Sequence, residues 1–121
     1  MATRILVVDD EPHMARLASY VLEKAGYEVR QANGGLEALA CLEAEEPDLV
    51  LCDIMMPDMD GFELVCTIRA DLRWRHLPVI MLTALGQESD LNRAKEAGAN
   101  GYLTKPFSSS QILSEVRRHL G

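Results

Sequence analysis

The sequence predicts an α/β protein in which a mostly parallel sheet of five strands has helices on both faces. Short apolar runs alternate, five times over, with segments whose apolar residues recur at helical spacing. The connections between these segments are short, as in β-then-α units that wind around one sheet. The 121 residues have the size of one domain, so we expect residues 1–121 to form a single unit.

Three of the strand-like runs are entirely apolar. Residues 5–8, 49–52 and 79–82 are typical of strands that are covered on both faces. Residues 29–32 mix polar and apolar side chains, and residues 102–103 form only a short run. We therefore expect the apolar strands at the centre and the other two at the edges. This predicts the strand order 2-1-3-4-5 of the flavodoxin-like doubly wound fold.

Amphipathic segments predicted as helices follow each strand. Their apolar or small positions are Met14, Leu17, Ala18, Val21, Leu22 and Ala25; then Gly35, Ala38, Leu39 and Leu42; then Leu64, Val65, Ile68 and Leu72; then Leu91, Ala94 and Gly98; and finally Ile112, Leu113, Val116 and Leu120. Gly26 ends the first helix, and the second ends before Pro47. The fourth helix has the weakest apolar stripe.

The charge balance limits the classes of partner. With 19 acidic and 12 basic side chains, the net charge is −7, which argues against direct binding of nucleic acid or of an anionic membrane. No apolar run approaches the roughly 20 residues that span a bilayer, and no signal peptide is recognisable. Cys41, Cys52 and Cys66 are expected to be buried free thiols, which predicts a cytoplasmic protein.

Polar side chains follow four of the predicted strands, at the point where each strand ends. They are Asp9, Asp10 and Glu11 after the first strand, Asp53 at the end of the third, Thr83 at the end of the fourth, and Lys105 with Pro106 after the fifth. The carboxyl ends of parallel strands lie at one edge of a sheet, where ligands of such folds bind. We therefore expect carboxylates, a hydroxyl and an ammonium to converge there.

Each of these residues also has a structural interpretation. Asp9 or Asp10 could cap the first helix, Thr83 could cap the fourth helix, and Lys105 could be a solvated turn residue. Together these interpretations explain less, because Asp53 ends an apolar strand and no helix starts directly after it. Clustered charges of this kind favour a functional site.

Neighbouring carboxylates repel one another unless a cation neutralises them. Magnesium suits this edge, because proteins hold it with one or two carboxylates, waters and substrate phosphate oxygens. No calcium-binding loop pattern is present, and His13, His76 and His119 are too scattered for a zinc site. Beside magnesium, a carboxylate can attack a phosphoryl group and form an aspartyl phosphate.

Four segments resemble the receiver domains of two-component response regulators. They are Ile5-Leu6-Val7-Val8-Asp9-Asp10-Glu11, Asp53-Ile54-Met55-Met56-Pro57-Asp58-Met59-Asp60-Gly61, Thr83-Ala84 and Tyr102-Leu103-Thr104-Lys105-Pro106-Phe107. The resemblance covers essentially the whole chain. It implies that Asp53 is the phosphoacceptor and that the domain catalyses its own phosphorylation and dephosphorylation.

The resemblance also implies a magnesium site. Asp10 and Asp53 match direct Mg²⁺ ligands, the backbone carbonyl of Met55 matches a third, and Asp9 matches a ligand that acts through water. The apolar side chains of Met55 and Leu85 occupy two positions that tune phosphoryl lifetime in this family. We expect them to restrict the attacking water and slow the decay of the phosphorylated form; the alternative is that they merely pack.

The remaining roles concern the switch and the partners. Lys105 matches the lysine that pairs with the phosphoryl group, and Thr83 with Tyr102 matches the switch pair. The Lys105–Pro106 bond resembles the cis peptide of the family. A histidine kinase or phosphotransfer protein is the implied donor. The face made by the fourth helix, fifth strand and fifth helix is the implied output surface toward an unknown effector.

Residues 69–76 form a basic segment that carries Trp74. The simplest interpretation is a set of cations near the carboxyl end of the third helix with Trp74 half-buried; partner binding is the alternative. Asn100 and Gly101 stand where DNA-binding relatives that dimerise through the output face often carry paired acids before the tyrosine, so this dimer is not predicted.

Three other functions fit parts of the pattern. A flavodoxin-like electron carrier would need a Ser/Thr/Gly-rich phosphate loop after the first strand, where acids stand instead. A phosphatase of the haloacid dehalogenase type would need a D-x-D pattern, which the adjacent Asp9 and Asp10 do not match. A receiver-like scaffold without chemistry would not require the acids and Lys105, all of which are present.

Overall fold

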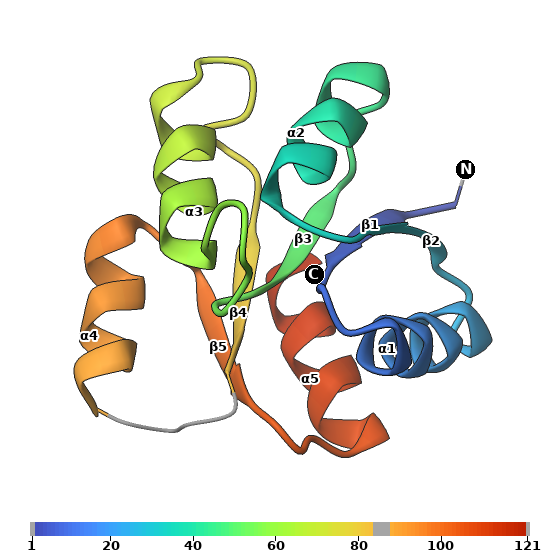
Figure 1. The fold of residues 1–121 in the computed structure, drawn as a ribbon. Helices are drawn as coiled ribbons and strands as arrows, with labels where there is room; N and C mark the ends of the chain where they lie inside the picture. Colours follow the sequence, from blue (N-terminus) through green and yellow to red (C-terminus); the bar gives the residue numbers. More distant parts are fainter. Residues whose placement is uncertain (1, 84–87, 121) are drawn as a thin grey trace.

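The protein folds as a five-stranded parallel sheet between two layers of helices (Figure 1). The computed structural model describes residues 2–83 and 88–120. The elements alternate as β1 (Arg4–Val8), α1 (Pro12–Lys24), β2 (Glu28–Ala32), α2 (Gly35–Ala44), β3 (Leu49–Asp53), α3 (Gly61–Ala70), β4 (Val79–Thr83), α4 (Glu88–Ala97), β5 (Gly101–Thr104) and α5 (Ser109–Leu120). The strand order is β2-β1-β3-β4-β5, which confirms the predicted topology.

Alternate side chains of each central strand enter opposite halves of the core. Ile5 and Val7 of β1 pack with α1 and α5, whereas Leu6 and Val8 pack with α2, α3 and α4. This alternation is the period of two that any strand imposes on its side chains. Because helices cover both faces, every residue of β3 and β4 is buried. The apolar runs of the sequence therefore mark the central strands correctly.

The third helix ends earlier than its apolar pattern predicts. Helix α3 stops at Ala70, and Leu72, expected on its apolar stripe, is 77% exposed. The chain turns after Ala70 and brings Trp74 and Leu77 back to the core, so Trp74 is buried rather than half-buried. The prediction failed because helical spacing was extended past the point where the backbone leaves the helix.

The three cysteines do not share one environment. Cys41 and Cys52 are buried as expected, but Cys66 is exposed, so its predicted burial was wrong. Helix α3 packs Leu64, Val65 and Ile68 against the sheet, and Cys66 falls on the opposite side of the helical turn. Burial is also the main reason why the pKa of the Cys52 thiol is raised.

In the basic segment of residues 69–76, the charge of Arg73 is paired with acids of the protein itself. The guanidinium of Arg73 donates two 2.8 Å hydrogen bonds to Glu43 and further ones to Asp71. It also lies over the ring of Trp74, 4.3 Å from the ring centroid. These contacts support the structural interpretation of the segment, because the Arg73–Glu43 pair joins the turn after α3 to α2.

None of the helices in the described part of the chain combines the length and apolar character that crossing a bilayer requires.

The start of α3 is closely tied to the end of β3. Asp60 caps the helix, because its side chain accepts a 2.8 Å bond from the backbone N–H of Glu63 in a capping box. The backbone N–H of Gly61 donates to the carbonyl oxygen of Ile54 at 2.8 Å. A Cβ at Gly61 would lie 2.6 Å from the carbonyl oxygen of Asp53, so only glycine fits without a shift of the backbone.

We predict that Gly61→Ala lowers the free energy of unfolding by about 1–3 kcal/mol, because the added methyl group overpacks a rigid backbone contact. Urea unfolding followed by circular dichroism measures the change. Cys66→Ala, at an exposed position of the same helix, is the control and is expected to stay within about 0.5 kcal/mol of the parent. Equal stability of the two variants would contradict the prediction.

Candidate functional site

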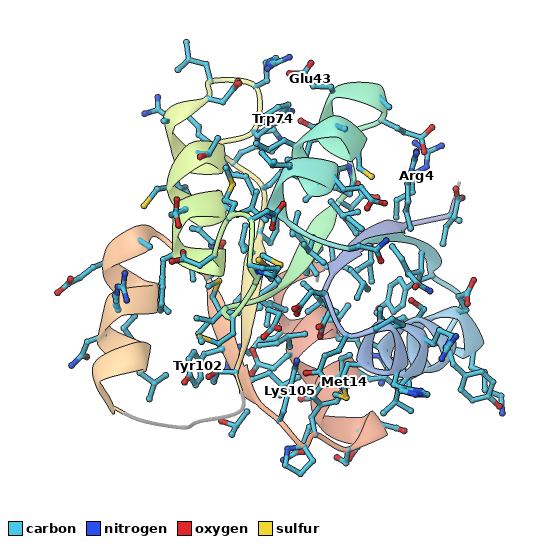
Figure 2. All side chains as sticks on the ribbon, viewed as in Figure 1. Arg4, Met14, Glu43, Trp74, Tyr102 and Lys105 are labelled. Atoms are coloured by element: carbon cyan, nitrogen blue, oxygen red, sulfur yellow. The ribbon has the colours of Figure 1, made fainter. Side chains whose placement is uncertain are left out.

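The residues predicted at the strand ends meet at the carboxyl edge of the sheet. Asp9 directly follows β1, Asp53 is the last residue of β3, and Thr83 is the last residue of β4. Lys105 directly follows β5, and Figure 2 labels its side chain and that of Tyr102 in β5. The site therefore draws on four parallel strands, which the sequence pattern predicted.

Three carboxylates form the acidic part of the site. Asp9, Asp10 and Asp53 each offer one oxygen within 4.8 Å of the others. Asp9 and Asp53 are buried, with only 1% and 5% of their surface exposed, whereas Asp10 is exposed. Hard oxygen donors packed this closely, with two of them removed from water, are the chemistry that suits a divalent cation such as Mg²⁺. The cluster could thus hold a metal ion.

Lys105 offsets part of this negative charge. Its Nζ lies 2.9 Å from Oδ2 of Asp9 and 3.4 Å from Oδ1 of Asp53. Burial lowers the pKa of Lys105, but the hydrogen bond to Asp9 and the charge of Asp53 outweigh this and raise it above its usual value. The backbone N–H of Lys105 donates to the carbonyl oxygen of Thr83, and the Lys105–Pro106 peptide is cis, as the resemblance implied.

The pKa of Asp53 is raised to about 6. Burial is the largest cause, Lys105 partly opposes it, and the charge of Asp9 raises the pKa further. Without a cation, one ammonium therefore does not fully compensate the buried carboxylates. A divalent cation would favour the ionised form of Asp53, which is the form that can act as a nucleophile.

The structural interpretations of these residues do not account for their placement. The N-cap of α1 is Glu11, whereas Asp9 accepts a 2.9 Å bond from the backbone N–H of Glu11 and turns its other oxygen toward Lys105. Thr83 is the last residue of β4 and is buried. The side chain of Lys105 is 10% exposed, so it is not a solvated turn residue.

The switch and lifetime positions are only partly described. Thr83 is 3% exposed, and Tyr102 is partly buried against the core half that includes α3 and α4. Met55 is 75% exposed, so it is not packed in the core. Leu85 lies outside the described residues.

Sequence reasoning missed Asp58 as a residue of structural importance near the site. Its carboxylate accepts hydrogen bonds from the backbone N–H groups of Gly35 and Leu36 at the start of α2. These groups lie 23 and 22 positions away in the chain. The only local signal was an acid in a Pro-Asp turn-forming pair, which does not reveal a partner so distant in sequence.

Comparison with known proteins decides the family. The family model of the response regulator receiver domain matches residues 5–117. This chain is a response regulator receiver domain. The family match and the intact acids favour the receiver over the electron carrier and the phosphatase that parts of the pattern also fitted.

Two curated relatives resemble the receiver domain over almost all of its length. The DNA-binding dual master transcriptional regulator RpaA of Synechocystis is 45% identical over 114 residues, which cover 94% of this chain and 47% of that protein. The alkaline phosphatase synthesis transcriptional regulatory protein PhoP of Bacillus subtilis is 44% identical over 119 residues, which cover 97% and 48%. The chain spans about half the length of these relatives.

Solved structures share the fold of the receiver domain. The chemotaxis protein CheY4 of Vibrio cholerae has a TM-score of 0.95 at 35% identity, covering 99% of this chain and 100% of that one. A CheY-like response regulator receiver domain protein from Methanospirillum hungatei has a TM-score of 0.92 at 32% identity, covering 99% and 94%. The architecture and the family assignment therefore agree.

The raised pKa of Asp53 predicts a pH-dependent cost to stability in the absence of divalent cations. The protonated carboxyl is favoured in the folded state, so stability is lost as pH rises from the ordinary value of 3.8 to about 6. We expect Asp53→Asn to raise the free energy of unfolding at pH 7.5 by about 1–3 kcal/mol, because the amide removes the buried charge.

Urea unfolding in EDTA at pH values from 4 to 7.5 measures this difference. The gap between Asp53→Asn and the parent should shrink toward pH 4, where the parent carboxyl is protonated as well. A gap that stays constant across this range would contradict the raised pKa.

Proposed function

We propose that the receiver domain, residues 1–121, accepts a phosphoryl group on Asp53 in the presence of Mg²⁺. The observation that carries this proposal is the position of Asp53. It is a buried carboxylate at a strand end that lies close to two further acids and to the ammonium of Lys105. The repulsion among these carboxylates favours binding of a cation, and an oxygen of Asp53 can then act as the nucleophile.

The roles of the metal-binding groups follow the family pattern. The carboxylates of Asp10 and Asp53 and the backbone carbonyl of Met55 would contact Mg²⁺, and Asp9 would act through water. Bound there, Mg²⁺ would neutralise the carboxylates and the charge that develops on the phosphoryl oxygens. The donor set of closely spaced oxygens supports this assignment.

Phosphoryl transfer needs only one new bond. An oxygen of Asp53 attacks the phosphorus, and the bond from phosphorus to the leaving group breaks, with the electron pair departing on the imidazole of a phosphohistidine or on acetate. Lys105 already lies beside Asp53 and can pair with a phosphoryl oxygen once the transfer begins. These residues make the domain a catalyst of its own phosphorylation and dephosphorylation.

The phosphorylated state is read through Thr83 and Tyr102. The Thr83 hydroxyl donates a hydrogen bond to the phosphoryl group, and Tyr102 turns inward as Thr83 moves. Tyr102 lies in β5, two residues before Thr104, which pairs with Thr83 across the sheet. The change therefore reaches the face formed by α4, β5 and α5.

The partners follow from this chemistry. The phosphoryl donor is a histidine kinase or a phosphotransfer protein, and an effector domain or protein receives the signal. The receiver domain itself makes no direct contact with nucleic acid or membrane, because its net charge is −7. Its role places it in the cytoplasm, where ATP supplies phosphoryl groups to kinases.

Incubation with Mg²⁺ and acetyl phosphate, followed by intact mass spectrometry, tests the central proposal. We expect one phosphoryl adduct on the parent protein, none on Asp53→Asn and none in EDTA. Asp48→Asn, an exposed acid at the other end of the sheet, should be phosphorylated like the parent. A phosphoryl adduct that persists in Asp53→Asn would contradict the proposal.

The lifetime of the phosphorylated state tests the roles of Met55 and Leu85. We expect the double variant Met55→Asn, Leu85→Glu to lose its phosphoryl group severalfold faster than the parent, because polar side chains help to position the attacking water. Leu72→Asn, which replaces another highly exposed apolar residue, is the control. Quenched samples analysed by intact mass follow the decay, and an unchanged rate in the double variant would refute this role.

A further inference from the structure

Asp58 joins the loop that follows the phosphoacceptor to the start of α2, a helix on the same face of the sheet as α3. Its Oδ1 accepts a 3.3 Å hydrogen bond from the backbone N–H of Gly35, and its Oδ2 accepts a 3.1 Å bond from that of Leu36. The bond from Leu36 is the largest reason why the pKa of Asp58 is lowered. Asp58 thus caps α2 from outside, since the N-cap residue Gly34 has no side chain to do so.

The two glycines at the start of α2 make room for this contact. A Cβ at Gly34 would lie 2.7 Å from Oδ1 of Asp58, and its three nearest atoms would all belong to Asp58. A Cβ at Gly35 would lie 2.7 Å from the Cβ of Met59. Gly34 has an extended backbone with φ −177°, so its place requires space and not a special conformation.

The loop is also held at its two ends. The N–H of Gly61 bonds to the carbonyl oxygen of Ile54, and Asp60 caps α3. Between these points, Met56 is buried and packs in the core. The side chain of Met55 is largely exposed and cannot hold its own backbone in place.

We propose that Asp58 is a positioning residue: by anchoring the loop to the N-terminus of α2, it directs the backbone carbonyl of Met55 toward Asp10 and Asp53 and so strengthens Mg²⁺ binding. This inference rests on the proposed function, because it requires the metal to bind at these three residues. The carbonyl of Met55 cannot be removed by substitution, and its position is therefore set by the residues that hold the loop.

Titration with MgCl₂, followed by amide chemical shifts in nuclear magnetic resonance spectra, tests the proposal. We expect Asp58→Ala to weaken Mg²⁺ binding about tenfold, as losses of outer supporting residues do in other metal sites. Asp58→Asn should be intermediate, because its amide oxygen can still accept one of the two N–H bonds. Both variants lose the charge of Asp58, so tighter Mg²⁺ binding by Asp58→Asn than by Asp58→Ala separates positioning from a general loss of charge.

Asp48→Ala is the matched control. Asp48 is exposed, and its carboxylate accepts a 2.8 Å bond from the backbone N–H of Arg4, so this variant also loses one charge and one backbone hydrogen bond. It lies at the amino end of β3, opposite the acidic cluster. We expect its Mg²⁺ affinity to equal that of the parent.

Gly34→Ala provides a second and independent test. In the parent, the added methyl group displaces the Asp58 carboxylate and should weaken Mg²⁺ binding as Asp58→Ala does. In the Asp58→Ala background, the atoms that it would strike are gone, so no further loss is expected. Equal losses in both backgrounds would contradict the proposed coupling.

Two outcomes separate this inference from the function on which it rests. If the parent binds no Mg²⁺, or if Asp53→Asn binds it as tightly as the parent, the metal site itself is wrong and both proposals fall. If Asp53→Asn loses Mg²⁺ binding while Asp58→Ala binds like the parent and only unfolds at lower urea, Asp58 merely stabilises α2. The positioning role is then refuted and the proposed function stands.

Discussion

The in-register parallel pairing of the central strands is the constraint on which the rest of the structure depends. Asp53 pairs with Leu82, and Thr83 pairs with Thr104, so β3, β4 and β5 end at one edge of the sheet. Each of these backbones is buried or covered by helices, and a slip in register would leave polar groups unsatisfied and reverse the faces of the strands. The fixed register places Oδ2 of Asp9 2.9 Å from Nζ of Lys105, which lies 96 positions later in the chain.

The same rigid strand pairing keeps charged side chains in buried positions, where their ionised forms are unfavourable. Two buried carboxylates share one ammonium, and the raised pKa of Asp53 records the remaining imbalance. A core built only for stability would place apolar side chains at these strand ends. The receiver domain instead keeps a site whose remaining negative charge a divalent cation could compensate. Stability and function compete here, as they commonly do at active sites.

The loop after Asp53 is held in place by contacts at its end and in its middle. Its far end is set by the capping box of Asp60, and its middle by Asp58 on the N-terminus of α2. Gly34, Gly35 and Gly61 lack side chains where the loop and its neighbours approach one another closely. Local capping and close backbone approach therefore support a site whose chemical groups come from strand ends.

By itself, the sequence determined the sheet order, the central strands and the convergence of Asp9, Asp53, Thr83 and Lys105, because apolar runs mark buried strands and parallel strands end together. Helical spacing misplaced Leu72, since periodicity does not show where a helix stops. Apolar neighbours misplaced Cys66, since they do not show which side of a helix meets the core. Only the tertiary structure decided the partner of Asp58. That contact depends on how α2 packs beside the β3–α3 loop, and packing between elements distant in sequence leaves no periodic trace in the chain.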